Sequence, residues 1–394
     1  MKRISLAISL LVMLTLSLQA QQAKYVFYFI GDGMGVNQVQ GTEMYLSELK
    51  GEIGITPLLF TQFPYATTAT TFSATNGVTD SAAAGTALAT GKKTKNGALG
   101  VTKDLDKVES VASWAKANGY RVGVSSSVSI DHATPAAFYA GVTSRSMTYD
   151  IAKQFTESQV DIAIGTGLEH FINRPDSLDL TAVLIEKGYD VYLNWESVLN
   201  TTSDKFVGIL PFADVHRRDA DKVTASAAEG HEVCLAAKMA AASGESEASH
   251  VSEPAVYLEK ATAKALDVLS RDNENGFFLM VESAIIDGYG HNNDGEGLVE
   301  EMKEFDNTLR QLVEYVNLHP ETLLVVTADH ETGGTGITYN THEVGTSIPL
   351  KLTFSTHGHT GTVAPVFAYG AGAGSFAGVM KNTDIPKRIE ELMK

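Results

Sequence analysis

The stretch KYVFYFIGDG, residues 24–33, is an apolar run of aromatic and β-branched residues that ends in a polar turn. Such a run is typical of a strand that is buried on both faces, as the strands of parallel sheets are. The run stops at Ile30, and Asp32 follows between two glycines. We therefore expect a buried strand whose carboxyl end carries a functional loop.

The same layout recurs along the chain. Six further short runs are predicted to be buried strands: residues 121–125, 160–164, 190–193, 276–281, 323–326 and 363–369. Helical patterns lie between them, among them 107–118, closed by Gly119, and 254–270, which follows the start signal Ser252-Glu253-Pro254. This alternation predicts an α/β fold with a largely parallel central sheet and helices on both faces.

Three carboxylates follow these predicted strands almost directly, namely Asp32, Glu282 and Asp329. In sheets of this kind, ligands bind beyond the carboxyl ends of the strands. One edge of one sheet could therefore gather all three side chains.

The length of 394 residues would allow two domains, although large α/β enzymes often use this length for one sheet. We find no internal repeat and no low-complexity linker. Residues 213–252 are rich in Ala, Glu and Ser and are interpreted as a surface insertion. We therefore expect residues 21–394 to form a single domain.

The first twenty residues have the order of a secretory signal peptide. Lys2 and Arg3 precede an apolar run, residues 4–18, that is too short to span a bilayer comfortably, and cleavage is expected after Ala20. No cysteine lies near this point to carry a lipid anchor, and the single cysteine, Cys234, cannot form a disulfide within the chain. We expect a soluble periplasmic or secreted protein without a membrane anchor.

The formal charge is strongly negative. It is −17 for the whole chain, and removal of the two basic residues of the leader takes it to −19. Such a surface argues against nucleic-acid backbones and anionic membranes as partners.

The stretch TDSAAAGTA, residues 79–87, sets a hydroxyl at the start of a small-residue helix. Free N–H groups and the positive end of the helix dipole would face an anion near Ser81. Capping of the helix by Asp80 or Ser81 is the simpler interpretation of this motif alone. However, five other segments offer Asp, Glu or His as metal ligands: residues 31–33, 131–135, 282–291, 327–330 and 357–359. Together, the serine and these ligands indicate metal-assisted phosphoryl transfer.

Two pairs of these ligands have informative spacing. Asp287 and His291 would share one face of a helix, but the glycines at 288 and 290 favour a loop; either could bring both side chains to one ion. Asp329 and His330 are adjacent at a predicted strand end. A lone histidine at such a place is more often a hydrogen-bonded core residue. Mixed imidazole and carboxylate ligands suit zinc, whereas Asp, Glu and Thr oxygens suit magnesium.

In their order, the six motifs between Tyr25 and about Gly378 resemble those of the alkaline phosphatases. The resemblance implies that residues 21–394 are one catalytic domain that hydrolyses small phosphate monoesters through a phosphoserine intermediate at Ser81. It also implies that Arg145, eleven residues after Thr134, binds the phosphate.

The resemblance further implies two zinc ions and one magnesium ion. The implied ligands are Asp287, His291 and His359 for one zinc, Asp32, Asp329 and His330 for the other, and Asp32, Thr134 and Glu282 for magnesium. His132 is added to the third site. His132 stands where bacterial members commonly have aspartate and resembles the animal form, so zinc is an alternative third metal. If His132 only packs against the loop, Asp131 is the alternative ligand. Gly288 replaces a lysine that is common in bacterial members.

Several alternatives remain open at this stage. A phosphodiesterase or sulfatase of the same superfamily would generally carry threonine or a modified cysteine in place of Ser81. A phosphate-binding protein without turnover would not need so many metal ligands. His357 could orient His359 or be an exposed loop histidine. Only 28 residues separate His330 from His359, which leaves little room for the interface insertion of animal members. The sequence therefore leaves a homodimer open.

Overall fold

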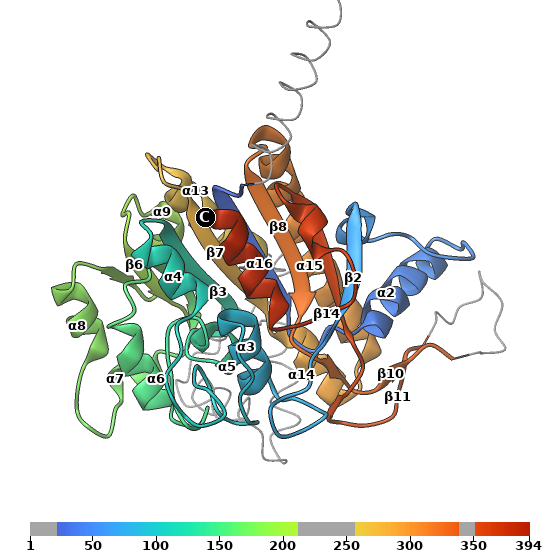
Figure 1. The fold of residues 1–394 in the computed structure, drawn as a ribbon, viewed down its shortest axis with the longest axis horizontal. Coiled ribbons are helices and arrows are strands. Elements are labelled where there is room, and N and C mark those ends of the chain that lie inside the picture. The colour runs from blue at the N-terminus through green and yellow to red at the C-terminus, as the bar shows by residue number, and fades with distance from the viewer. Residues whose placement is uncertain (1–21, 212–256, 339–350) are drawn as a thin grey trace, which may run out of the picture.

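The computed structural model describes residues 22–211, 257–338 and 351–394, and it is built around one ten-stranded sheet (Figure 1). The strands follow the order β14 (Met380–Lys381), β2 (Tyr65–Thr70), β13 (Ala364–Gly370), β8 (Thr322–Ala328), β1 (Tyr25–Gly31), β7 (Phe277–Ser283), β3 (Arg121–Ser129), β4 (Ile162–Thr166), β6 (Phe206–Ile209) and β5 (Asp190–Tyr192). The sheet is parallel except at β13, which runs antiparallel to both of its neighbours. The predicted α/β fold is confirmed.

All seven predicted strands are present, and the central sheet contains three more that the sequence did not reveal. Strand β2 has the sequence YATTAT and is partly exposed, so it lacks the apolar signal of a buried strand. Strand β14 has only two residues, and β6 has four. Two short antiparallel pairs complete the described strands: β10 (Thr335–Gly336) with β11 (Thr353–Phe354), and β9 (Glu331–Thr332) with β12 (His359–Thr360).

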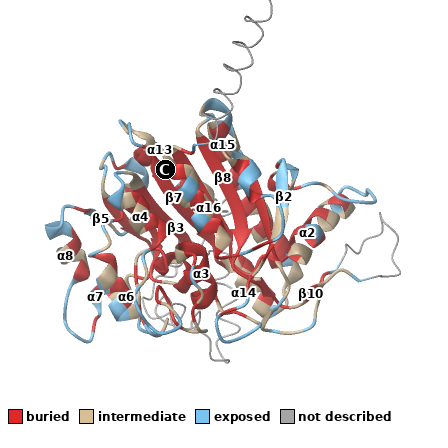
Figure 2. Ribbon diagram, in the orientation of Figure 1, coloured by how far each residue is buried: buried red, intermediate tan, exposed pale blue. Residues whose placement is uncertain are grey.

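Helices cover both faces of the sheet, and the alternating side chains of β1 enter a separate core on each face. Val26, Tyr28 and Ile30 lie in the core under α3 (Ser81–Thr90), α4 (Val111–Ala117), α5 (Ala133–Ala136), α6 (Thr148–Phe155), α7 (Glu169–Ile172), α8 (Leu180–Glu186) and α16 (Asp384–Met393). Phe27 and Phe29 lie in the core under α2 (Val36–Leu49), α9 (Trp195–Asn200), α13 (Tyr257–Ser270), α14 (Ile285–Asn292) and α15 (Gly295–Leu318). Figure 2 shows the central strands as buried throughout.

The register of the three central strands aligns their carboxyl ends. Ile30 of β1 pairs with Glu282 of β7, and Gly31 pairs with Ala328 of β8. Asp32 directly follows Gly31, and Asp329 directly follows Ala328. The sheet thus gathers the three carboxylates at one edge, as expected.

α4 begins later than the sequence pattern 107–118 suggested, whereas the expected start of the helix 254–270 lies outside the described residues. α4 begins at Val111 because the side chain of Ser110 accepts a hydrogen bond from the Ser113 N–H and caps the helix there. α13 begins at Tyr257, the first described residue after a gap. The expected leader 1–20 and the expected insertion 213–252, with Cys234, lie outside the described residues. Within the described ranges, no helix is both long and apolar enough to cross a membrane.

Candidate active site

Ser81 is the first residue of α3, and its neighbour Asp80 provides the helix cap. Oδ1 of Asp80 accepts a hydrogen bond from the Ala83 N–H at 3.0 Å, and Oδ2 accepts one from the Gly97 N–H at 2.9 Å. Ser81 is therefore not needed as a cap. Its hydroxyl is buried, and Oγ lies 3.2 Å from Nε2 of His330.

A first group of potential metal ligands consists of Asp287, His291 and His359, whose ligand atoms lie within 4.8 Å of one another. The expected loop around Asp287 is wrong, because α14 is a helix from Ile285 to Asn292. A side chain at Gly290 would come within 3.0 Å of Thr332, so the glycine lets the helix pack against β9. Tertiary packing here outweighs the low helix propensity of glycine.

His359 reaches this group through the short β9–β12 pair, in which it lies opposite Thr332. Its Nε2 is 3.3 Å from Nε2 of His291 and 3.6 Å from Oδ1 of Asp287. On the other side, its ring stacks on the ring of His330, with centroids 3.6 Å apart. His359 therefore lies between the first group and the second.

The second group, Asp32, Asp329 and His330, is completely buried. Nε2 of His330 lies 3.4 Å from Oδ1 of Asp32 and 3.2 Å from Oδ2 of Asp329. Oδ1 of Asp329 accepts hydrogen bonds from the N–H groups of Gly33 and His330, which leaves Oδ2 facing the group.

A third group consists of Asp32, His132 and Glu282. Nδ1 of His132 is 3.5 Å from Oε1 of Glu282, and Oγ1 of Thr134 is buried without a hydrogen-bond partner among the described residues. Asp131 instead directs its carboxylate to His170, at 2.5 Å. Of the two candidates, the structure thus groups His132, and not Asp131, with Asp32.

Arg145 lies beside the third group. Its Nη2 is 3.0 Å from Nε2 of His132, and its Nη1 is 4.0 Å from Oδ2 of Asp80. The side chain of Arg145 is a quarter exposed. It therefore remains accessible to an anion that approaches Ser81.

The three histidines of the first two groups share one orientation. Nδ1 of His359 contacts the backbone carbonyl of Thr79, and Nδ1 of His291 contacts the backbone carbonyl of His357. Nδ1 of His330 lies 3.2 Å from Oγ1 of Thr332. A carbonyl can only accept, so Nδ1 carries a proton in the first two rings, and when these rings are neutral Nε2 offers its lone pair inward. This is the tautomer that a metal requires.

His357 is an exposed loop residue, which agrees with one of the two sequence interpretations. In addition, its Nδ1 contacts the carbonyl of His291 at 2.7 Å, while its own carbonyl accepts from His291. It therefore orients His291 and not His359. Thr332 was missed by sequence reasoning: its hydroxyl donates to Asp287 and also contacts His330. Only the folded chain reveals this bridge between two groups.

Burial and mutual repulsion make the carboxylates unfavourable as an isolated set. Burial, together with the charges of Asp329, Asp287 and Glu282, raises the pKa of Asp32 well above its usual value. Burial and the charge of Asp287 likewise raise the pKa of Asp329. Both oxygens of Asp32 and one oxygen each of Asp329 and Glu282 lack hydrogen-bond partners among the described residues. Divalent cations would satisfy these atoms.

The histidines respond to the same surroundings. Burial lowers the pKa of His330 well below its usual value, which keeps it neutral, the form that binds metals. The hydrogen bond to Asp287 raises the pKa of His291. Burial alone would raise the pKa of Asp287, but its hydrogen bond with His291 and the neighbouring imidazoles hold it below its usual range. The donor set fits divalent cations.

Buried carboxylates and imidazoles beside a helix-borne hydroxyl are typical of metal-dependent hydrolases, and this fold and site place the protein in that class. The sequence profile of the alkaline phosphatases matches residues 23–351, so the chain belongs to the alkaline phosphatase family. The resemblance noted from the motifs is confirmed. The protein is a metal-dependent phosphomonoester hydrolase that acts on small phosphate substrates.

Individual relatives agree in sequence and in structure. Alkaline phosphatase 4 of Bacillus subtilis (strain 168) is 28% identical, and the match covers 95% of this chain and 89% of the relative. The structure of alkaline phosphatase from the Antarctic bacterium TAB5 is 32% identical with a TM-score of 0.77, and the match covers 95% of this chain and 98% of that one. A variant of the TAB5 enzyme, with aspartate in place of a histidine, has Mg bound in its M3 site; it matches with a TM-score of 0.75.

Proposed function

We propose that this phosphatase hydrolyses phosphate monoesters through a covalent phosphoserine at Ser81. The observation that carries the proposal is the position of the Ser81 hydroxyl, 3.2 Å from His330, at the start of α3 and next to the second group of potential ligands. A hydroxyl held beside cations can attack phosphorus, so Ser81 can be the nucleophile without help from an Asp, Glu, His or Cys side chain in that role.

The three groups would hold two zinc ions and one magnesium ion. Asp287, His291 and His359 offer the first zinc site, and Asp32, Asp329 and His330 offer the second. For the third ion, Asp32, Thr134 and Glu282 supply hard oxygen ligands. The imidazole of His132 lies beside them as a bulky neighbour, and its nitrogen would bind zinc in this site only in place of the hydrogen bond that it accepts from Arg145. When bound, the cations would lower the pKa of the serine hydroxyl and of a water molecule and neutralise phosphoryl oxygens.

Ser81 and Arg145 would divide the remaining work. In the first step, Oγ of Ser81 forms a bond to phosphorus while the bond to the leaving alcohol breaks and the alcohol takes up a proton. Water then attacks the phosphoserine, which releases inorganic phosphate and restores the hydroxyl. The planar guanidinium of Arg145 would hold two phosphoryl oxygens, a geometry that lysine cannot offer.

We also propose that the mature enzyme is exported after cleavage behind Ala20, which places it in the periplasm or in the medium. This proposal rests on the basic start, the apolar run and the small residue at the end of the first twenty residues. Mass measurement of the exported protein would give the cleavage position directly.

The covalent step is tested by stopping turnover with acid and measuring the intact mass. We expect one added phosphoryl group on the wild type and none on Ser81→Ala. Thr79→Ser, which keeps the serine and changes a neighbouring hydroxyl residue, should trap phosphate like the wild type. Equal trapping in Ser81→Ala would assign the intermediate to another residue and refute the proposal.

A further inference from the structure

The carboxylate of Asp131 lies beside the third group but points away from it. The side chain is fully buried, and Oδ2 lies 2.5 Å from Nδ1 of His170 in α7. Asp131 follows β3, whereas His170 follows β4. Removing the imidazole would leave a buried carboxyl group without this polar neighbour, which is unfavourable. The contact therefore ties the segment that carries His132 to α7.

The backbone around this contact is closely packed. The N–H of Ile130 donates to the carbonyl of Thr166 at 3.1 Å. Gly167 has φ +100, and a Cβ there would come within 2.7 Å of both Oδ1 of Asp131 and Cβ of Ser129. The two turns touch so closely that only glycine fits, which fixes the distance over which His170 and Asp131 meet.

A second attachment links Arg174, two residues after the end of α7, to Tyr149 at the start of α6. The side chain of Arg174 is only 2% exposed, and Nη1 donates to the carbonyls of Tyr149, at 2.7 Å, and of His170, at 3.0 Å. Nε and Nη2 pair with both oxygens of Asp176. The guanidinium also lies 5.4 Å from the ring centroid of Tyr149. Tyr149 is four residues after Arg145, so α7 also holds the segment that follows Arg145.

The two attached segments meet again inside the site. Nη2 of Arg145 lies 3.0 Å from Nε2 of His132. Because arginine has no acceptor, Arg145 donates this hydrogen bond and His132 accepts it. The orientation of the guanidinium thus depends on the relative placement of the two segments that α7 holds.

We propose that His170 and Arg174, the α7 clamp, are positioning residues for phosphate binding: through Asp131 and Tyr149 they fix His132 and Arg145 relative to each other. The inference rests on the proposed role of Arg145. Neither clamp residue needs to touch the substrate. A guanidinium binds two oxygens only when its plane is held in the right orientation, so loosening the clamp weakens phosphate binding.

The test compares His170→Ala with the metal-loaded wild type. KM and the inhibition constant of inorganic phosphate should rise roughly tenfold, the lower end of what the loss of an outer partner costs at such sites, while kcat changes less. Calorimetric titration with phosphate should show the same weakening. His170→Asn should restore most of the affinity, because its amide nitrogen can donate to Asp131 from near the former position of Nδ1.

A double-mutant cycle shows whether the effect passes through Arg145. In an Arg145→Ala background, adding His170→Ala should not weaken phosphate binding further. If Arg145→Ala weakens binding and His170→Ala does not, or if the two effects simply add, the inference is overturned and the proposed role of Arg145 stands. If neither variant weakens binding, both fall.

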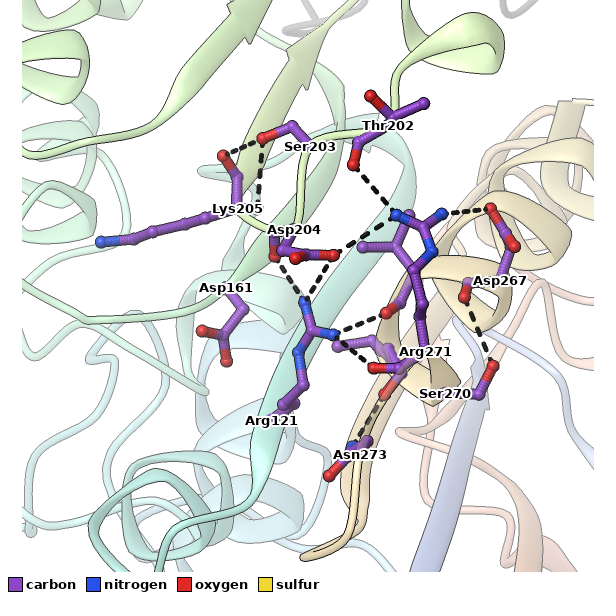
Figure 3. Close-up of polar contacts among 12 residues, drawn as sticks. Arg121, Asp161, Thr202, Ser203, Asp204, Lys205, Asp267, Ser270, Arg271 and Asn273 are labelled. Atoms are coloured by element: carbon purple, nitrogen blue, oxygen red, sulfur yellow. Dashed lines mark hydrogen bonds and ion pairs between the residues drawn. The ribbon is translucent and has the colours of Figure 1, made fainter.

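Two further variants complete the design. Arg174→Gln breaks the second attachment and should shift the phosphate inhibition constant in the same direction, even if His170→Ala fails to fold. Arg271→Gln is the matched control, in the polar cluster of Figure 3, where Arg271 donates to the carbonyl of Thr202 and pairs with Asp204 and Asp267. This cluster surrounds the amino end of β3, opposite the site. Arg271→Gln should lower the melting temperature and leave phosphate binding unchanged.

Discussion

The ring of His132 contacts both the third group of potential ligands and the guanidinium of Arg145. Nδ1 faces Glu282, and Nε2 accepts from Arg145. An imidazole in the third group replaces the hard oxygen that magnesium prefers, so this group should discriminate poorly between magnesium and zinc.

His132→Asp is therefore expected to raise the preference of the third site for magnesium and to make activity depend more visibly on added magnesium. The measurement is elemental analysis combined with magnesium titration of the activity. Asp131→Asn is the comparison variant, because Asp131 is the alternative ligand and the structure pairs it with His170. A change of third-site metal content in Asp131→Asn alone would contradict the placement of His132.

At the scale of single residues, the sequence identifies the candidate ligands better than it identifies the residues that orient them. Asp32, Glu282 and Asp329 could be found because each follows an apolar run that predicts a strand end. Thr332 could not be found in this way, because its role depends on a contact between β9 and α14 that no spacing in the sequence encodes. The same holds for the pairing of Asp131 with His170.

Among the elements, α14 shows most clearly where local propensity fails. Its two glycines predict a loop, yet they have different surroundings within the helix. A Cβ at Gly288 would meet nothing within 4 Å, whereas a Cβ at Gly290 would press against the side chain and carbonyl of Thr332.

This difference gives a matched pair of variants. Gly288→Ala should raise the free energy of unfolding by roughly 0.5 to 1 kcal/mol, because alanine loses less backbone entropy than glycine in a helix. Gly290→Ala should lower it and reduce activity, because Thr332 is held by Asp287 and cannot move freely. Urea unfolding at fixed zinc measures both. Equal effects of the two substitutions would show that contact with β9 does not set the position of α14.

Helix α15 contains a buried carboxylate whose protonation affects stability. Asp306 accepts hydrogen bonds from the N–H groups of Leu59 and Phe60, and burial raises its pKa to about 6. The folded state keeps this proton at pH values at which the unfolded state has lost it. The contribution of Asp306 to stability is therefore greatest at low pH and is lost as the pH rises through about 6.

Between pH 7 and pH 5, the wild type should consequently gain about 1 kcal/mol relative to Asp306→Asn, which does not titrate. Denaturant unfolding of both proteins at each pH gives this difference, and changes in metal occupancy affect both proteins alike. A difference that stays constant over this range would mean that Asp306 is ionised throughout.

At the scale of the whole molecule, the candidate ligands link segments from nearly the full length of the chain, from Asp32 to His359. Removal of the metals would leave Asp32, Glu282, Asp287 and Asp329 as a crowded set of carboxylates. Chelation should therefore abolish activity and also lower the melting temperature. Activity should return with zinc, and magnesium should increase it further. Full activity in enzyme that elemental analysis shows to be metal-free would refute the mechanism.

The architecture was largely predictable from the sequence because each central strand is an apolar run between turn signals. The reversed direction of β13 was not, since strand direction depends on how the chain returns to the sheet. β2 was missed because its threonines and partial exposure give it a sequence that resembles a loop rather than a buried strand.

The order of the strands also has a consequence for how the protein is made. β1 is the first strand to leave the ribosome, yet its two partners, β7 and β8, begin only at Phe277 and Thr322. Until then, the segment YVFYFIG has no strand to pair with on either side. Such a segment tends to aggregate, and pairing over so long a distance is slow. The newly made chain therefore depends on being kept apart from other copies, and its refolding yield should fall steeply as protein concentration rises.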